Sequence, residues 1–275
     1  MYGAILGDII GSPYEFDRGG KTKDFPLFCS RCRFTDDTVM TLAVADALMG
    51  VSADLEEEEI RRRLVRSLQA FGRAYPDIGY GARFYRWLMD SDPQPYGSWG
   101  NGSAMRVCAA AWLFEDLDTV RRMARLSADV THDHPEGIKG AEATAAAIFL
   151  ARIGSTKPEI RAYIEETFRY DLSRTCDEIR PGYFHVASCQ QTVPEAVTAF
   201  LEGDSFEDVI RTAVSLGGDC DTLTCIAGAM AEGFYGVPEE LKQECRNRLG
   251  KNLLEVLNRF DEYLAFRKQF MDGEG

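Results

Sequence analysis

Two short acidic motifs stand where apolar, alanine-containing segments begin, and their residue types are the ones best suited to chemistry. They are Thr35-Asp36-Asp37-Thr38 and Gly217-Gly218-Asp219-Cys220-Asp221-Thr222. Aspartate and threonine at a helix start cap free backbone amides, and the helix dipole favours negative charge there. Capping accounts for one acid per helix but not for two, because neighbouring carboxylates repel each other unless a cation neutralises them. The motifs therefore leave two interpretations open, simple helix caps and a metal site.

The metal interpretation has a definite chemistry, because the aspartates and threonines of both motifs offer only oxygen ligands. Oxygen ligands suit hard cations such as Mg²⁺ and Mn²⁺. Four carboxylates from two helix starts favour a two-metal site over a single ion. Gly217 and Gly218 permit backbone conformations and close approaches that a side chain would block. Cys220 is predicted to be a packing residue, since a hard metal has little use for a thiol.

A glycine-rich segment is the second candidate for chemistry, and it lies between the two acidic motifs. It contains Tyr96, Gly97, Ser98, Trp99, Gly100, Asn101 and Gly102. Glycines expose backbone N–H groups, and the segment leads into a predicted helix, which favours binding of an anion such as phosphate. The two aromatic residues offer a flat surface for a purine ring. The alternative interpretation is an ordinary loop between helices whose aromatic side chains pack on the core.

The chain has only three histidines, which are His132, His134 and His185. A zinc site built from histidines is therefore disfavoured. His132 and His134 precede a predicted helix, where a histidine is more often a cap than a ligand. Glu15 follows an apolar N-terminal helix and, taken alone, is predicted to be a surface acid.

The elements that must position these residues are helices. Apolar residues recur with a period near 3.6, and no run with a strand period of two is convincing. One exposed helix carries Glu57, Glu58 and Glu59 four residues before Arg61, Arg62 and Arg63. Further helices are expected over 36–49, 80–90, 103–114, 117–129, 136–153, 158–169, 192–201, 205–215, 221–235, 239–249 and 252–269, with loops near 16–33, 91–102 and 176–191. Segments rich in alanine and glycine are expected at the centre, because small side chains let helix axes approach closely. The sequence predicts one compact all-α domain over 1–275, an orthogonal helical bundle.

Composition excludes several classes of protein. The chain has 275 residues, a net charge of −13 and 45% apolar residues. That apolar content is too high for a disordered chain, and no apolar run approaches the roughly 20 residues that cross a bilayer. The excess of acid argues against a protein that coats nucleic acid by neutralising phosphates. We expect no membrane partner, and the sequence does not indicate an oligomeric state.

The cysteines and the N-terminus indicate an intracellular setting. Asp8 interrupts the first apolar stretch and no basic region precedes it, so this stretch does not resemble a signal peptide. Eight cysteines are expected to stay reduced in the cytoplasm. Cys29 and Cys32 form a lone Cys-x-x-Cys pair without a second pair at zinc-finger spacing, so partly buried thiols are favoured over a structural zinc.

Taken in order, the segments GDIIGSPYEF, FTDDTVM, YGSWGNGSAMRV, THDHPEG, TVPEAVTAF and GGDCDT resemble the ADP-ribosylglycohydrolase family, over about residues 1–236. The resemblance implies a helical domain around two Mg²⁺ or Mn²⁺ ions. By motif position it implies that the metal ligands are Thr35, Asp36, Asp37, Asp219, Asp221 and Thr222. It places Gly97, Ser98 and Trp99 at the diphosphate and adenine, with Trp99 as the adenine platform and Gly100, Asn101 and Gly102 continuing that loop. His132 matches a histidine that contacts substrate, and Glu15 matches an acid that closes over the metals.

The function that the resemblance implies is metal-dependent hydrolysis of the ribosyl C1″ bond in ADP-ribosylated side chains or other ADP-ribose conjugates. Asp36, Asp37 and Glu15 are the catalytic candidates, and the Gly217 and Gly218 amides join the glycine-rich loop at the diphosphate. A non-catalytic, crystallin-like protein that binds ADP-ribose on the same fold is the alternative. A helical prenyl-synthase type is excluded because its DDxxD spacing is missing after Asp36-Asp37. The leaving group is not readable from the sequence.

Overall fold

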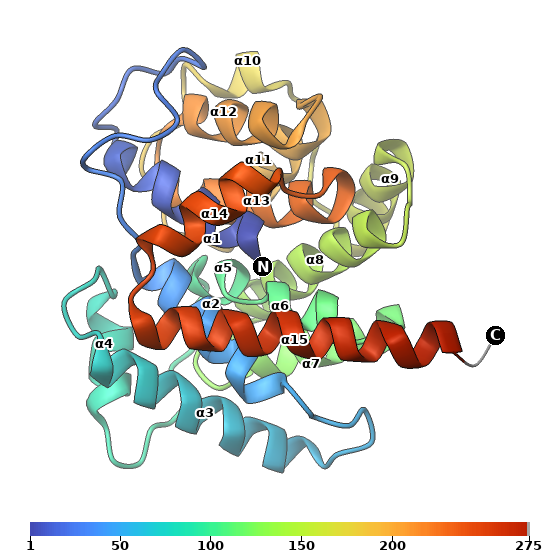
Figure 1. Ribbon diagram of the computed structural model, residues 1–275. Coiled ribbons are helices and arrows are strands. Elements are labelled where there is room, and N and C mark those ends of the chain that lie inside the picture. The colour runs from blue at the N-terminus through green and yellow to red at the C-terminus, as the bar shows by residue number, and fades with distance from the viewer. Residues whose placement is uncertain (274–275) are drawn as a thin grey trace.

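A computed structural model describes residues 1–273, with side chains up to residue 269, and the chain is all-α as predicted (Figure 1). Its helices are α1 (Tyr2–Gly11), the 3-10 helix η1 (Ser12–Tyr14), α2 (Asp36–Leu48), α3 (Glu57–Ala74), α4 (Ala82–Met89), α5 (Gly102–Met105), α6 (Cys108–Leu113), α7 (Leu117–Asp129), α8 (Pro135–Arg152), α9 (Lys157–Phe168), α10 (Cys176–Ile179), α11 (Cys189–Glu202), α12 (Phe206–Leu216), α13 (Cys220–Tyr235), α14 (Glu239–Arg248) and α15 (Lys251–Gly273). Over these residues the β pairing is limited to one isolated bridge between Gly100 and Ser188.

Two predicted elements differ from the observed ones. The helix expected over 103–114 is broken after Met105, and the guanidinium of Arg106 turns inward to donate hydrogen bonds to Ser127 in the last turn of α7 and to Thr131 just after it. The loop expected over 176–191 contains the short helix α10. Thr175 and Glu178 form a capping box that starts α10, because each side chain bonds the backbone N–H of the other.

The centre of the molecule is the helix pair α1 and α13. All ten residues of α1 are buried, as is α13 from Cys220 to Ala231. Glycines make this contact possible, because a Cβ atom added to Gly7 would lie 2.2 Å from the carbonyl oxygen of Thr224. Helices α8, α11 and α12 pack on the other sides of α13. The prediction that segments rich in small residues are central is therefore confirmed, and this packing brings the starts of α2 and α13 to one region.

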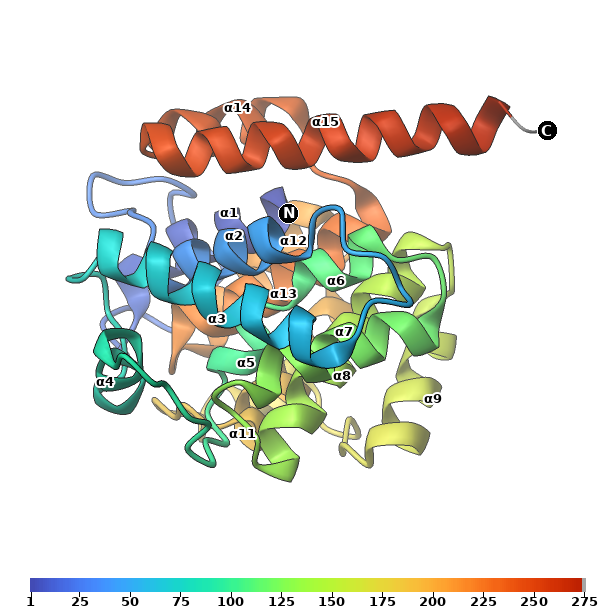
Figure 2. The ribbon, with the colours of Figure 1, turned by 90° about the horizontal axis from the view of Figure 1, so that it is seen from below.

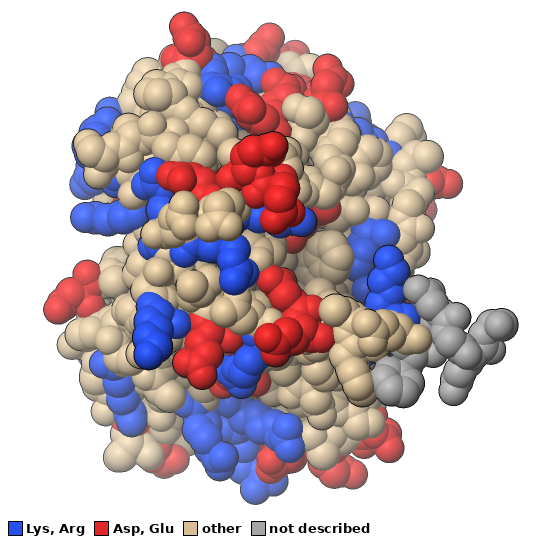
Figure 3. All heavy atoms as spheres, in the orientation of Figure 1, with Lys and Arg blue, Asp and Glu red and all other residues tan. Residues whose placement is uncertain are grey.

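The outer layers carry the charge. Figure 2 shows α14 and α15 as a layer over α1 and α2, and Figure 3 shows acidic and basic side chains interspersed on this face. On α3, Arg61 pairs with Asp129 of α7 at 2.9 Å and with Glu57 at 3.1 Å. The predicted exposed face of α3 is thus confirmed as a network of locally balanced charges. Across the described residues, no helix combines the length and apolarity needed to cross a membrane.

The tight α1–α13 contact gives a prediction about stability. Replacing Gly7 by alanine is expected to lower the free energy of unfolding by about 3 kcal/mol, because the new methyl group meets rigid backbone and forces the two helices apart. Urea denaturation measures this change. The matched control is Gly182→Ala, where an added Cβ has no atom within 4 Å, and we expect a change within about 0.5 kcal/mol there. Equal stability of Gly7→Ala and the wild type would contradict the packing described.

Candidate functional site

Three helices bring a buried carboxylate cluster together, and one of its members is not a predicted site residue. Thr35 caps α2, and its hydroxyl donates to Asp8 of α1 at 2.7 Å. Asp8 is fully buried and also accepts the backbone N–H groups of Thr35 at 2.8 Å and Thr38 at 3.1 Å. Asp8 therefore fixes the start of α2 against α1. The signal for it in the sequence is a single carboxylate within an otherwise apolar helix.

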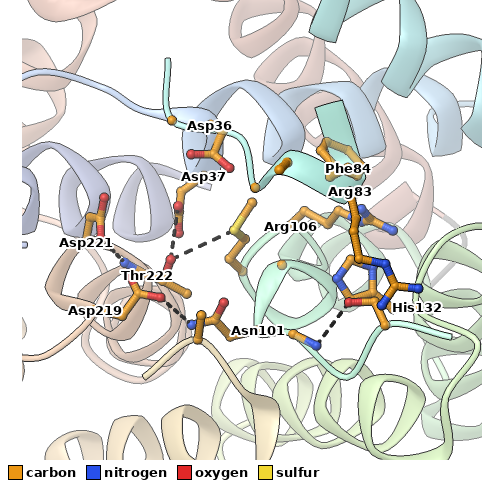
Figure 4. A pocket seen from close by; sticks show the side chains of 18 of the residues that line it. Asp36, Asp37, Arg83, Phe84, Asn101, Arg106, His132, Asp219, Asp221 and Thr222 are labelled. Atoms are coloured by element: carbon orange, nitrogen blue, oxygen red, sulfur yellow. Dashed lines mark hydrogen bonds between the residues drawn. The ribbon is translucent and has the colours of Figure 1, made fainter. Parts of the chain in front are cut away.

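The carboxylates form two groups that share Asp221. Ligand oxygens of Asp8, Asp37 and Asp221 lie within 4.8 Å of one another, and so do those of Glu15, Asp219 and Asp221. Two groups with a common member are an arrangement that suits two neighbouring cations. Figure 4 shows the acids from the starts of α2 and α13 gathered at one end of the cavity.

The other predicted ligands lie at the edge of these groups. The hydroxyl of Thr222 donates to Asp37 Oδ2 at 3.1 Å. Asp36 is half-buried and lines the same cavity, where it lies close to Gly79. The structure thus brings all six predicted metal ligands to one place, with Thr35 beneath the others as the cap of α2.

The clustered carboxylates repel one another, and this repulsion and their burial raise their pKa values. Burial raises the pKa of Asp37 and Asp221 well above the usual value, and repulsion from neighbouring carboxylates adds to this effect. Burial and the charge of Asp8 raise the pKa of Asp36 to about 8. The pKa of Glu15 is raised by burial and then by Asp219. Such a group favours either bound protons or bound cations.

The hydrogen bonding of one carboxylate oxygen shows whether these residues suit a metal ion. Asp37 Oδ1 is buried and has no hydrogen-bond partner among the described residues. A buried carboxylate oxygen without a partner is costly. An all-oxygen set of repelling carboxylates, one of whose buried oxygens has no hydrogen-bond partner, matches the ligand preference of Mg²⁺ or Mn²⁺. The residues present therefore fit a hard divalent cation.

A cavity of about 520 Å³ adjoins the cluster. One wall carries the acids, and the opposite wall carries Arg83, Phe84, Arg106 and His132 (Figure 4). The cavity is therefore acidic at one end and basic at the other. Of the far wall, only His132 is a predicted site residue; Arg83 and Phe84 come from α4, which no sequence motif marked.

The glycine-rich loop lies on the cavity wall and is tied to the acids. Ser98, Gly100, Asn101 and Gly102 line the cavity. The side-chain amide of Asn101 donates to Asp219 Oδ2 at 2.7 Å. Its backbone N–H donates to the carbonyl oxygen of Ala187 at 3.0 Å, which holds the loop against the segment before α11. The loop and the second acidic motif are thus one connected unit.

Gly97 and Trp99 lie outside the cavity lining. The N–H of Gly97 donates to Asp133 at 2.6 Å. Trp99 is 50% exposed, and its ring meets the edge of His134 with ring centres 5.5 Å apart. It borders a shallow depression next to the cavity, together with Val186 and Gln191. His134 itself caps α8, because its ring accepts the N–H of Glu136 at 3.1 Å.

Gly217 and Gly218 also lie outside the cavity lining, and both have positive φ angles, 76° and 75°. Their amides are engaged within the chain: Gly217 N–H donates to the carbonyl oxygen of Val214 at 3.1 Å, and Gly218 N–H donates to Asp17 at 2.9 Å. A phosphate would have to displace these partners. The two glycines instead give the backbone the turn that presents Asp219 to the cluster.

Glu15 belongs to a segment that closes one side of the cavity. Asp17 accepts the N–H groups of Gly218 and, at 3.0 Å, of His185. The rings of Phe16 and His185 are in contact, with centres 4.6 Å apart and planes tilted by 42°, and both residues line the cavity. Asp17 and His185 are 168 residues apart in the sequence. Glu15 is therefore held at the cluster by contacts that its neighbours make with a segment distant in the chain. The interpretation of Glu15 as a surface acid is wrong.

The Cys-x-x-Cys pair lies apart from the carboxylates. The Sγ atoms of Cys29 and Cys32 are 3.7 Å apart, and all eight cysteines are free. Within the described residues, neither group of candidate metal ligands includes a cysteine. The favoured prediction of partly buried thiols agrees with this placement.

Comparisons with known proteins agree with the resemblance found in the sequence. The ADP-ribosylglycohydrolase family model matches residues 1–269. The mouse protein ADP-ribosylhydrolase ARH3 is 28% identical over 328 aligned positions, covering 89% of this chain and 86% of the mouse protein. Its human counterpart is 27% identical, with 89% and 87% covered. An uncharacterized protein of Archaeoglobus fulgidus is 27% identical over 90% of both chains. A solved structure described as an ADP-ribosylglycohydrolase-related protein complex has a TM-score of 0.67 at 24% identity, covering 95% of this chain and 94% of that chain, and shares the fold.

Proposed function

This chain belongs to the ADP-ribosylglycohydrolase family, as a distant relative of ARH3, and from that premise we propose that it is a Mg²⁺- or Mn²⁺-dependent hydrolase. Its substrates are ADP-ribose conjugates, in which it cleaves the ribosyl C1″ bond and releases free ADP-ribose. The observation that carries the proposal is the pair of carboxylate groups sharing Asp221 at the end of a 520 Å³ cavity. The name ADP-ribosylhydrolase, borne by the vertebrate relatives, supports the substrate class.

The metal ligands in this proposal come from the two helix starts. Asp37, Asp219 and Asp221 belong to the carboxylate groups, and Thr35, Asp36 and Thr222 complete the set. When bound, two such cations orient the hydroxyls of a ribose and lower the pKa of a bound water. Asp8 belongs to one of the two carboxylate groups, and it also fixes the start of α2, because its oxygens accept hydrogen bonds from Thr35 and Thr38.

The protein side chains supply the remaining chemistry. Cleavage of a ribosyl bond passes through an oxocarbenium-like state, which a nearby carboxylate stabilises. Asp36, Asp37 and Glu15 are the candidates for this role and for moving a proton to or from water. Ser98, Gly100 and His132 hold the diphosphate, and Trp99 beside the cavity offers its exposed face to the adenine. In this pose the cavity between His132 and the acids holds the ribose that carries the leaving group.

A panel of conjugates tests the proposal and identifies the leaving group. Arginine-linked peptide, serine-linked peptide and O-acetyl-ADP-ribose are incubated with the protein and Mg²⁺, and free ADP-ribose is measured by chromatography. We expect release from at least one conjugate, and loss of that release in Asp219→Asn. Tight binding of ADP-ribose in calorimetry with no turnover of any conjugate would contradict the proposal and favour a non-catalytic binding protein.

A further inference from the structure

A line of three side chains joins a buried arginine to the cavity wall. Arg106 is 1% exposed, and its Nη2 donates to the carbonyl oxygen of Ser127 at 2.5 Å and to the hydroxyl of Thr131 at 2.8 Å. The same hydroxyl oxygen lies 2.7 Å from Nδ1 of His132. Figure 4 shows the Arg106 and His132 side chains on the same wall of the cavity.

The competing acceptors around the Thr131 hydroxyl favour one direction for its hydrogen. A guanidinium only donates, so the hydroxyl oxygen accepts from Arg106 and has one hydrogen of its own to place. The carbonyl oxygen of Ala128 competes for it at 3.4 Å. That oxygen already accepts the backbone N–H groups of Thr131 at 3.0 Å and His132 at 2.7 Å, which occupy its two lone pairs. The hydroxyl therefore donates to Nδ1 of His132, the nearer acceptor.

Burial keeps the His132 ring neutral. The residue is 5% exposed, and burial lowers its pKa well below the usual value, with Arg106 and Arg83 lowering it further. A neutral imidazole that accepts at Nδ1 carries its proton on Nε2. Nε2 faces the glycine-rich loop, where a Cβ added to Gly102 would lie 3.3 Å from it and one added to Gly100 3.5 Å. The glycines thus leave space in front of this N–H.

We propose that Arg106 and Thr131 are positioning residues that hold His132 in its Nε2–H tautomer, so that the ring presents a neutral donor to an acceptor oxygen of the bound substrate. A phosphate oxygen or a ribose hydroxyl of ADP-ribose supplies that acceptor; this identification rests on the proposed function, whereas the tautomer does not. Arg106 acts by donating to the Thr131 oxygen, which turns one lone pair toward the guanidinium; the crowded Ala128 oxygen at 3.4 Å then makes Nδ1 at 2.7 Å the better acceptor for the hydroxyl hydrogen. The buried charge of Arg106 also disfavours protonation of the ring, so the donor stays neutral.

Heteronuclear NMR of the full chain with isotopically labelled histidine rings tests the tautomer directly. Only three histidines contribute signals, and His134→Gln and His185→Gln identify the other two. We expect the wild-type His132 ring to be neutral with its proton on Nε2 from about pH 5.5 to pH 8. A proton on Nδ1, or a ring that gains charge within this range, would overturn the proposal without any variant.

Three variants test the positioning residues. Thr131→Val keeps the shape but removes the hydroxyl, so we expect a mixture of tautomers. The affinity for ADP-ribose measured by calorimetry should fall with the fraction of the ring that still carries its proton on Nε2, about twofold for an equal mixture. Thr131→Ser restores the hydroxyl and is expected to restore both. Arg106→Lys keeps the positive charge but removes the planar guanidinium that donates to Ser127 and Thr131. We expect this variant also to give a mixture of His132 tautomers.

The matched control is Thr144→Val, which removes a buried hydroxyl without a hydrogen-bond partner; its His132 signals and affinity should equal those of the wild type. Unchanged His132 signals in Thr131→Val would overturn the proposal. An Nε2–H ring in a wild-type protein that binds no ADP-ribose would support the positioning role of Arg106 and Thr131 while refuting the proposed function.

Discussion

Asp37→Asn is expected to reduce the rate of ADP-ribose release roughly a thousandfold and, in chelator, to make the protein more stable. Asp37 is 2% exposed, and it belongs to a carboxylate group with Asp8 and Asp221. Asparagine removes a charge that the neighbouring carboxylates repel, so folding without metal becomes easier. The same change removes an anionic ligand oxygen, so metal binding and catalysis become harder. A loss of activity with a gain in stability separates this role from simple structural damage.

The control for Asp37→Asn is Asp116→Asn, the same substitution at another helix start. Asp116 caps α7, accepts the N–H of Thr119 at 2.8 Å and belongs to neither group of candidate metal ligands found among the described residues. We expect its rate of ADP-ribose release to equal that of the wild type. The two measurements are thermal unfolding in chelator and the rate of ADP-ribose release, and both are made on Asp37→Asn and on Asp116→Asn. An active Asp37→Asn, or one less stable than the wild type in chelator, would contradict the role given to Asp37.

The metal-free protein is expected to lose stability as the pH rises, and bound Mn²⁺ is expected to remove that loss. Burial and neighbouring carboxylates raise the folded-state pKa of Asp36, Asp37 and Asp221 above the unfolded value. A group with a raised folded pKa favours folding while it is protonated. Its contribution is fully present below the unfolded pKa, near 4, and disappears as the pH rises through the folded pKa. For Asp36 the folded pKa is about 8, so the loss spans about pH 4 to pH 8.

Thermal unfolding curves from about pH 5 to pH 8, with chelator and with Mn²⁺, measure this effect. Metal ligands must be ionised, so the cation favours the deprotonated cluster and its stabilisation grows with pH. At about 100 times its dissociation constant a bound ion adds about 2.7 kcal/mol. At each pH, the unfolding temperature in chelator is subtracted from the unfolding temperature in Mn²⁺. This subtraction removes the contribution of acids elsewhere in the chain, because they titrate in both conditions. A difference that shrinks as the pH rises would contradict a buried carboxylate cluster built for cations.

The two acidic motifs were predictable because their signal is local. A helix start with two adjacent acids exceeds what capping requires, and the excess is visible in the sequence of 36–37 and 219–221 alone. Asp8 carries no such signal, since its partners Thr35 and Thr38 lie 27 and 30 residues away. Only the packing of α1 against α2 turns a single acid in an apolar helix into part of the cluster.

The far wall of the cavity and the position of Glu15 depend on contacts that sequence spacing does not encode. Arg106 turns inward at the break between α5 and α6, a break that the continuous helical pattern of 103–114 conceals. Glu15 reaches the acids because Asp17, two residues on, binds the backbone of Gly218 and His185. Likewise, the engaged amides of Gly217 and Gly218 are visible only once Asp17 is placed. The local motifs thus predict the acids that α2 and the start of α13 contribute to the cluster, and tertiary contacts decide what surrounds them.

The rate of ADP-ribose release during metal add-back tests the central claim most directly. The protein is stripped with chelator, freed of the chelator, and assayed on the conjugate that the panel identifies, while Mg²⁺ or Mn²⁺ is titrated back. The claim predicts no release in the stripped protein and a rise to a plateau as the metal is added, with Asp37→Asn remaining near the baseline. Release at the same rate in the stripped protein and in the metal-loaded protein would contradict it.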